Sequence, residues 1–125
     1  MTVAGTLTNN GTLSLSSAGS VTSLALASDL LLTGSGQTVL GTHVYNRIDS
    51  NNGTLRTLTI DTGHILTGGG ALGTSYSGNA LKIVNQGTLD VSSDMSVSVN
   101  DTGGAGFNNS AGLIDVANGA ALTLA

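Results

Sequence analysis

The most constraining feature of this sequence is a regular spacing of glycine. Six glycines follow one another at equal intervals: Gly19, Gly36, Gly53, Gly70, Gly87 and Gly104. Because glycine adopts backbone conformations that other residues avoid, a fixed glycine interval indicates a turn that returns at a fixed interval. The spacing predicts a repeat architecture with a structural period of about 17 residues.

The side chains repeat at twice that interval. The stretch 19–36 aligns without a gap on 53–70, with Leu-Thr-Gly at the same place in both. The pentapeptide 51–55, Asn-Asn-Gly-Thr-Leu, returns at 85–89 as Asn-Gln-Gly-Thr-Leu. A segment twice as long as the glycine interval has therefore been copied within the chain.

Short alternations of apolar and polar residues lie between corners rich in Gly, Asn and Asp. Leu13-Ser14-Leu15 and Leu122-Thr123-Leu124 are examples, and this pattern places alternate side chains on one face of a strand. Strands this short need neighbours, and coils of about 17 residues would stack equivalent strands in parallel around one aliphatic core. We predict an all-β fold: a parallel β-solenoid formed by the single segment 1–125, with right-handed coils because the hexapeptide rhythm of the left-handed form is absent. An antiparallel β-sandwich is the alternative.

Composition narrows the range of functions. The chain has no cysteine, proline or tryptophan, so disulfides, thiolate nucleophiles and cysteine-type zinc sites are excluded. Its only cations are Arg47, Arg56 and Lys82, which are too few to neutralise several phosphates, so nucleic acid is not expected as a partner. No apolar run approaches the ~20 residues of a membrane span.

The two histidines, His43 and His64, are separated by roughly one predicted coil. Two imidazoles are fewer than the three or four ligands of a usual metal site, and we predict two exposed histidines. Asp61 shortly precedes His64, but no strand-turn-helix elbow accompanies them, so a catalytic triad is not expected.

The acidic residues are scattered, and we assign them to corners, where Asp caps turns. They are Asp29, Asp49, Asp61, Asp90, Asp94, Asp101 and Asp115, of which Asp90 and Asp94 form the only close pair. Residues 101–109 resemble a calcium-binding nonapeptide turn, but an Asn stands where its Asp belongs, and we predict a glycine-rich loop. Four asparagines begin Asn-x-Ser/Thr patterns and are also assigned to corners: Asn10, Asn52, Asn100 and Asn108. We therefore predict no catalytic, cofactor-binding or metal-binding residue and no cofactor.

Neither end of the chain carries a cap. Strand alternation begins at Val3 and continues to Leu124, with no amphipathic helix and no proline-bearing or charged edge. An open coil exposes unpaired backbone groups and a slice of apolar core. We expect the chain to stack end to end on its own copies or to adjoin further coils of a longer chain.

Three patterns in the chain belong together: Asn-x-Gly-Thr-Leu followed by alternating strands, Leu-Thr-Gly-x-Gly at 32–36 and 66–70, and the stretch 109–119. They resemble the passenger repeats of bacterial autotransporters and filamentous haemagglutinin-type exoproteins. The resemblance implies a right-handed parallel β-helix that serves as a stalk or adhesin, located outside the cell or on a bacterial surface. It implies a host or surface receptor as a further partner. The family's signal peptide and translocator barrel are missing, which implies an excised segment.

We predict a structural or adhesive role without enzymatic activity. Ice binding is an alternative, since some ice-binding proteins are threonine-rich solenoids. However, the only Thr-x-Thr triplets, 6–8 and 57–59, do not recur at the glycine interval. A polysaccharide-directed enzyme is a more distant alternative, since it would need clustered acids in a groove.

Overall fold

The computed structural model describes residues 1–75, 78–100 and 106–125, and these ranges contain no α-helix. They form one sheet of 12 strands, and every strand pair is parallel. The strands are β1 (Thr2–Thr8), β2 (Thr12–Leu15), β3 (Thr22–Thr33), β4 (Gln37–Leu40), β5 (Asn46–Ser50), β6 (Arg56–Ile60), β7 (Ile65–Leu72), β8 (Leu81–Asn85), β9 (Thr88–Val97), β10 (Phe107–Asn108), β11 (Leu113–Val116) and β12 (Leu122–Leu124).

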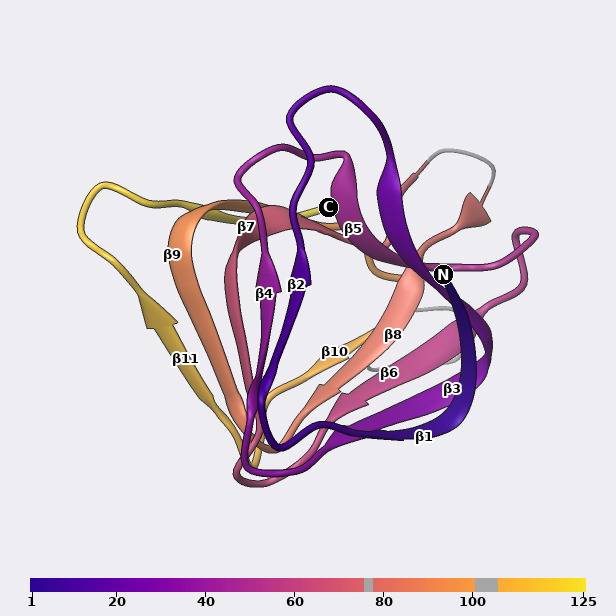
Figure 1. The fold of residues 1–125 in the computed structure, drawn as a ribbon, viewed down its shortest axis with the longest axis horizontal. Helices are drawn as coiled ribbons and strands as arrows, with labels where there is room; N and C mark the ends of the chain where they lie inside the picture. The colour runs from indigo at the N-terminus through magenta and orange to yellow at the C-terminus, as the bar shows by residue number, and fades with distance from the viewer. Residues whose placement is uncertain (76–77, 101–105) are drawn as a thin grey trace.

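The strands wind into a solenoid with three faces (Figure 1). We name each face after one of its strands. The β6 face stacks the ends of β1 and β3 with β6, β8 and β10. The β4 face stacks β2, β4, the starts of β7 and β9, and β11. The β5 face stacks the starts of β1 and β3 with β5, the ends of β7 and β9, and β12.

The chain visits these faces in a constant order, from the β5 face to the β6 face to the β4 face. In Figure 1 the N-terminal coil lies nearest the viewer, and the chain winds clockwise as it recedes. The coils are therefore right-handed. The predicted parallel β-solenoid is confirmed, and it makes about five turns.

The length of one coil differs from the prediction. Along the β4 face, Leu13 pairs with Thr38, Thr38 with Leu66, and Leu66 with Leu89. One coil thus takes about 25 residues, which lies within the range of repeat lengths typical of solenoids. The shorter predicted coil, equal to one glycine interval, is wrong.

The glycine spacing arises because one interval covers two of the three faces. Gly19 and Gly70 both lie at the corner between the β4 and β5 faces, and Gly36 and Gly87 both lie at the corner between the β6 and β4 faces. Three glycine intervals therefore equal two coils, and a glycine returns to the same corner only at every third interval. Gly53 lies at the third corner, and Gly104 lies outside the described residues.

The internal copy is likewise displaced by one face. Leu24 on the β5 face aligns with Leu58 on the β6 face, and Leu32 on the β6 face aligns with Leu66 on the β4 face. The repeating element is therefore one strand and its corner, and three such elements make a coil.

The core is a stack of aliphatic files along the solenoid axis. On the β6 face, Leu30, Leu58 and Ile83 succeed one another in register, and each is at most 1% exposed. On the β5 face the corresponding file is Leu24, Ile48, Leu72 and Val97, all fully buried. Burying each side chain stabilises the fold by about 1.5–3 kcal/mol.

Two corner glycines show how closely the coils approach. A Cβ at Gly36 would collide with the backbone of Gly11 in the preceding coil. Gly70 has a φ of 72°, and a Cβ there would collide with the carbonyl oxygen of Asn46. At these two corners neighbouring coils stack backbone on backbone, which only glycine allows.

The first and last coils each have one free edge within the described residues. Strands β1 and β2 pair only with β3 and β4, and β10, β11 and β12 pair only with β8 and β9. Apolar side chains that continue the inward files at the C-terminal edge are consequently exposed: Val116 is 41% and Leu124 50% accessible.

Candidate functional site

His64 lies in the interior, at the corner between the β6 and β4 faces. It is fully buried, and its Nε2 is 3.1 Å from the Thr38 hydroxyl. Its Nδ1 lies 3.3 Å from the Gly34 carbonyl oxygen, which can only accept, so Nδ1 carries the proton and the Thr38 hydroxyl donates to Nε2. Burial lowers the pKa of His64, and this effect outweighs the hydrogen bond to Gly34 and the charge of Asp61, which raise it.

The prediction of two exposed histidines is therefore wrong for His64. The residue stands two positions before Leu66, so strand alternation points both side chains inward. The prediction is right for His43, which lies in the exposed loop between β4 and β5 with its ring centroid 4.4 Å from that of Tyr45. The described residues contain no group of three or more side chains that could hold a metal ion.

The aspartates join neighbouring coils. Three of them accept a hydrogen bond from a hydroxyl of the preceding coil: Ser23 to Asp49 at 2.7 Å, Thr33 to Asp61 at 2.6 Å and Thr67 to Asp90 at 2.7 Å. Two others accept a backbone N–H from the following coil: Thr57 to Asp29 at 2.8 Å and Ala121 to Asp94 at 3.0 Å. Asp90 and Asp94 thus contact separate partners and do not form an acid pair.

The prediction that the acids lie at corners is wrong for Asp49, Asp90 and Asp115, which lie within β5, β9 and β11 and point outward from the ladder. Asp61 does accept the N–H of Thr62 within its own turn, at 2.9 Å. Asp115 is exposed and stands in register with Asp90. Asp101 and most of the glycine-rich loop at 101–109 lie outside the described residues.

The asparagines of the Asn-x-Ser/Thr patterns make backbone contacts. Asn10 accepts the N–H of Ser35, Asn108 accepts that of Ser110, and Asn52 adopts a left-handed φ of 57°. The backbone N–H of Asn100 donates to the Leu81 carbonyl. Asn10, Asn52 and Asn100 lie between strands, as predicted, whereas Asn108 lies within β10, so the corner assignment is wrong for it.

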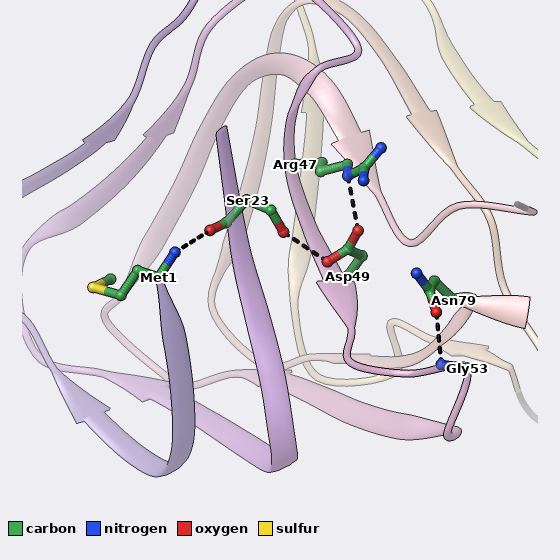
Figure 2. A network of polar contacts seen from close by, with 6 residues as sticks. All are labelled: Met1, Ser23, Arg47, Asp49, Gly53 and Asn79. Atoms are coloured by element: carbon green, nitrogen blue, oxygen red, sulfur yellow. Dashed lines mark hydrogen bonds and ion pairs between the residues drawn. The ribbon is translucent and has the colours of Figure 1, made fainter. Parts of the chain in front are cut away.

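A second polar network lies on the outside of the β5 face (Figure 2). Arg47 Nε forms an ion pair with Asp49 Oδ2 at 2.8 Å, while Ser23 donates to the other carboxylate oxygen at 2.7 Å. The N-terminal ammonium of Met1 donates to the Ser23 carbonyl at 2.8 Å. Asp49 is 3% exposed, so its charge is compensated where water cannot reach it. The network joins the first three coils.

A groove of about 200 Å³ lies beside Arg47. Small residues line it, among them Ala71, Ser96 and Ser98, together with Tyr45. A larger, polar hollow of about 380 Å³ lies at the corner between the β4 and β5 faces. Its one charged side chain among the described residues, Asp94, already accepts the Ala121 N–H. Of the two hollows, the Arg47 groove therefore offers the larger variety of side chains to a ligand: a guanidinium, an aromatic ring and hydroxyls.

Sequence reasoning missed this groove. Arg47 pairs with Ala71, and Ala71 with Ser96, across three coils. The coil length expected from the glycine interval does not place these residues together. Only the correct coil length, read from the strand pairing, would have done so.

Comparisons with protein-family profiles, with curated proteins and with solved structures found no match. No helix in the described part of the chain is long and apolar enough to cross a membrane.

Proposed function

We propose that this chain is a non-enzymatic structural segment of an exported bacterial surface protein, a β-helical stalk or fibre that lengthens by stacking coil on coil. The observation that carries the proposal is the pair of free edges on the first and last coils. Such edges present backbone N–H and C=O groups in the geometry of the next ladder. A further coil satisfies these groups, whether it comes from a second copy or from a longer chain.

The two edges are complementary when the register is extended by one coil. With β2 of a second copy placed on β11, Leu13 falls next to Ile114 and Leu15 next to Val116, because these residues belong to the same inward files. Asp115 then faces Ser14, which brings a hydroxyl beside a carboxylate as between coils inside the chain, here with the carboxylate on the earlier coil. The apolar positions continue the core, and the polar positions continue the outer surface.

The test is the size of the purified chain as a function of concentration. We expect light scattering to show multiples of the mass of one chain, and electron microscopy to show unbranched fibres one solenoid wide. Val116→Lys places a charge in the apolar end of the core and should give monomers. Ile65→Lys, at an outward position of the same face, should still stack. Monodisperse wild-type monomers at high concentration would refute self-stacking.

The structure supports ice binding less well. A flat ice-binding face needs Thr in several successive coils. One outward file on the β6 face reads Thr6, Leu31, Thr59 and Val84, and in another Thr8 and Thr33 are followed by a contact with Asp61 of the next coil. A thermal-hysteresis assay separates the two proposals, since a stalk segment leaves the freezing point unchanged.

A further inference from the structure

We propose that the groove beside Arg47 binds a sugar that carries a carboxylate, such as a uronic acid unit. The lining combines a guanidinium paired with a carboxylate, an exposed aromatic ring and serine side chains: Arg47, Tyr45, Ser96 and Ser98. It lies on the side of the solenoid, so its occupancy does not depend on stacking at the ends.

The groove follows from the outward file of the β5 face. Arg47, Ala71 and Ser96 occupy equivalent outward positions in three successive coils. A long side chain followed by two short ones leaves a step along the solenoid axis. The loop residues 44–45 and 73–75 also line this hollow. The hollow is therefore formed by three stacked strands together with the two loops beside them.

The guanidinium lies against the buried carboxylate. Arg47 Nε forms an ion pair with Asp49 Oδ2 without hydrogen-bond geometry, and Ser23 donates to the other oxygen of Asp49. Among the described residues this ion pair uses only the inner nitrogen, which leaves the two Nη groups for a ligand. Planar N–H groups bind carboxylates through paired hydrogen bonds, which a neutral sugar does not offer.

Tyr45 is also held by its neighbours. Its N–H donates to His43 Nδ1 at 3.2 Å, its carbonyl accepts the Thr22 N–H at 2.8 Å, and its ring contacts the His43 ring. The side chain is nevertheless 40% exposed. An exposed, positioned aromatic ring provides an apolar surface for the face of a sugar ring, and adjacent hydroxyls provide partners for sugar hydroxyls.

The dimensions and charges favour a small ligand. The groove of about 200 Å³ is smaller than the roughly 300–1,000 Å³ of drug-sized sites. One cation cannot neutralise successive phosphates, so a nucleic acid strand is not the expected occupant. A single acidic sugar unit matches both the volume and the one available cation.

The test is an NMR titration of the full chain with methyl glucuronoside, methyl glucoside and acetate. We expect saturable shifts at the amides of Tyr45, Arg47 and Ser96 with the glucuronoside, with a Kd on the order of 1 mM. Methyl glucoside and acetate should each bind about tenfold more weakly, because methyl glucoside lacks the carboxylate and acetate lacks the sugar ring. Acetate binding as tightly as the glucuronoside would show a simple anion site and overturn the proposal.

Three variants localise the binding. Arg47→Lys keeps the positive charge but loses the planar pair of N–H donors, and it should weaken binding about tenfold. Ser96→Leu should abolish binding, because a larger side chain at this lining position fills the groove, and Ser96 takes no part in the ion pair. Lys82→Gln, which removes a cation on the β6 face, should leave binding unchanged. The proposal fails if the glucuronoside shifts no groove amides, or if Ser96→Leu folds and still binds with wild-type affinity.

Discussion

At the scale of single residues, the polar groups of this protein are mostly used to join coils. Hydroxyls of one coil donate to carboxylates of the next, and the one buried histidine is satisfied by a hydroxyl and a carbonyl on the preceding coil. Each such bond contributes about 0.5–1.5 kcal/mol, more where a carboxylate accepts. The sequence offers few charges, and the structure places most of its described acids where they hold adjacent turns together.

The burial of His64 makes stability depend on pH. Its pKa is lowered from 6.5 in the folded state, so near neutrality the unfolded chain takes up the proton first. The free energy of unfolding should therefore be constant above the unfolded pKa of 6.5 and should decrease as the pH falls below it, until the folded pKa is reached. The slope should not exceed about 1.4 kcal/mol per pH unit. Urea unfolding between pH 5 and pH 8 measures it.

Variants of the two histidines test the assignment of this slope. His64→Gln should remove the dependence between about pH 5 and pH 7, because the carboxylates titrate below this range. His43→Gln, in an exposed loop, should keep it. Persistence of the slope in His64→Gln would contradict the assignment.

The corner glycines differ in what surrounds them. Gly36→Ala should reduce the free energy of unfolding by about 2 kcal/mol or more, because its Cβ meets the backbone of Gly11. At Gly19 the position of an added Cβ has no neighbouring atom within 4 Å among the described residues. Gly19→Ala should therefore be neutral or stabilising by up to about 1 kcal/mol. Thermal unfolding of the two variants compares them, and equal losses would show that the glycine spacing reflects turn conformation alone.

At the scale of the strand, inward and outward positions alternate, so neighbouring residues should differ sharply in importance. Leu66 is fully buried in the file between Thr38 and Leu89, whereas the adjacent Ile65 is 38% exposed. Leu66→Ala should cost about 2–5 kcal/mol through lost burial and the cavity left behind. Ile65→Ala should cost about 1 kcal/mol or less. Urea unfolding distinguishes them, and similar losses would mean that the strand is placed in the wrong register.

Strand existence and strand alternation could be predicted from the sequence, because both are properties of a few consecutive residues. The coil length could not, because it depends on which distant strands pair. Glycine returns to an equivalent corner only after three glycine intervals. The spacing of the glycines alone does not show which corner each of them occupies, so it does not give the coil length. The wrong coil length is also the reason why the groove was not predicted, since Arg47, Ala71 and Ser96 become neighbours only at the longer coil length. The burial of His64 could have been predicted from its position two residues before Leu66. It was not predicted, because histidine side chains are usually exposed.

At the scale of the whole molecule, the solenoid is a linear array in which each coil contacts only its neighbours. Strands β4 and β7 are paired on both sides, whereas β2 and β11 are paired on one. Amide hydrogen exchange should therefore be slowest in the middle of the β4 face and fastest at its two ends.

End-to-end stacking should change this gradient in a specific way. Raising the protein concentration should slow exchange in β2 and β11 of the wild type but not in Val116→Lys. Uniform protection across all the strands of this face at low concentration would contradict the nearest-neighbour description.

The displacement of the internal copy by one face has a consequence for how such a chain can acquire function. A duplicated segment of this length carries its surface residues one third of a turn around the axis. A binding groove multiplied in this way would spiral around the shaft, and neighbouring grooves would point in different directions. Only duplication by a whole number of coils, such as the two coils that three glycine intervals span, would align them along one side. The length of the copied segment thus decides whether a fibre presents its ligands to one flat surface or to all sides at once.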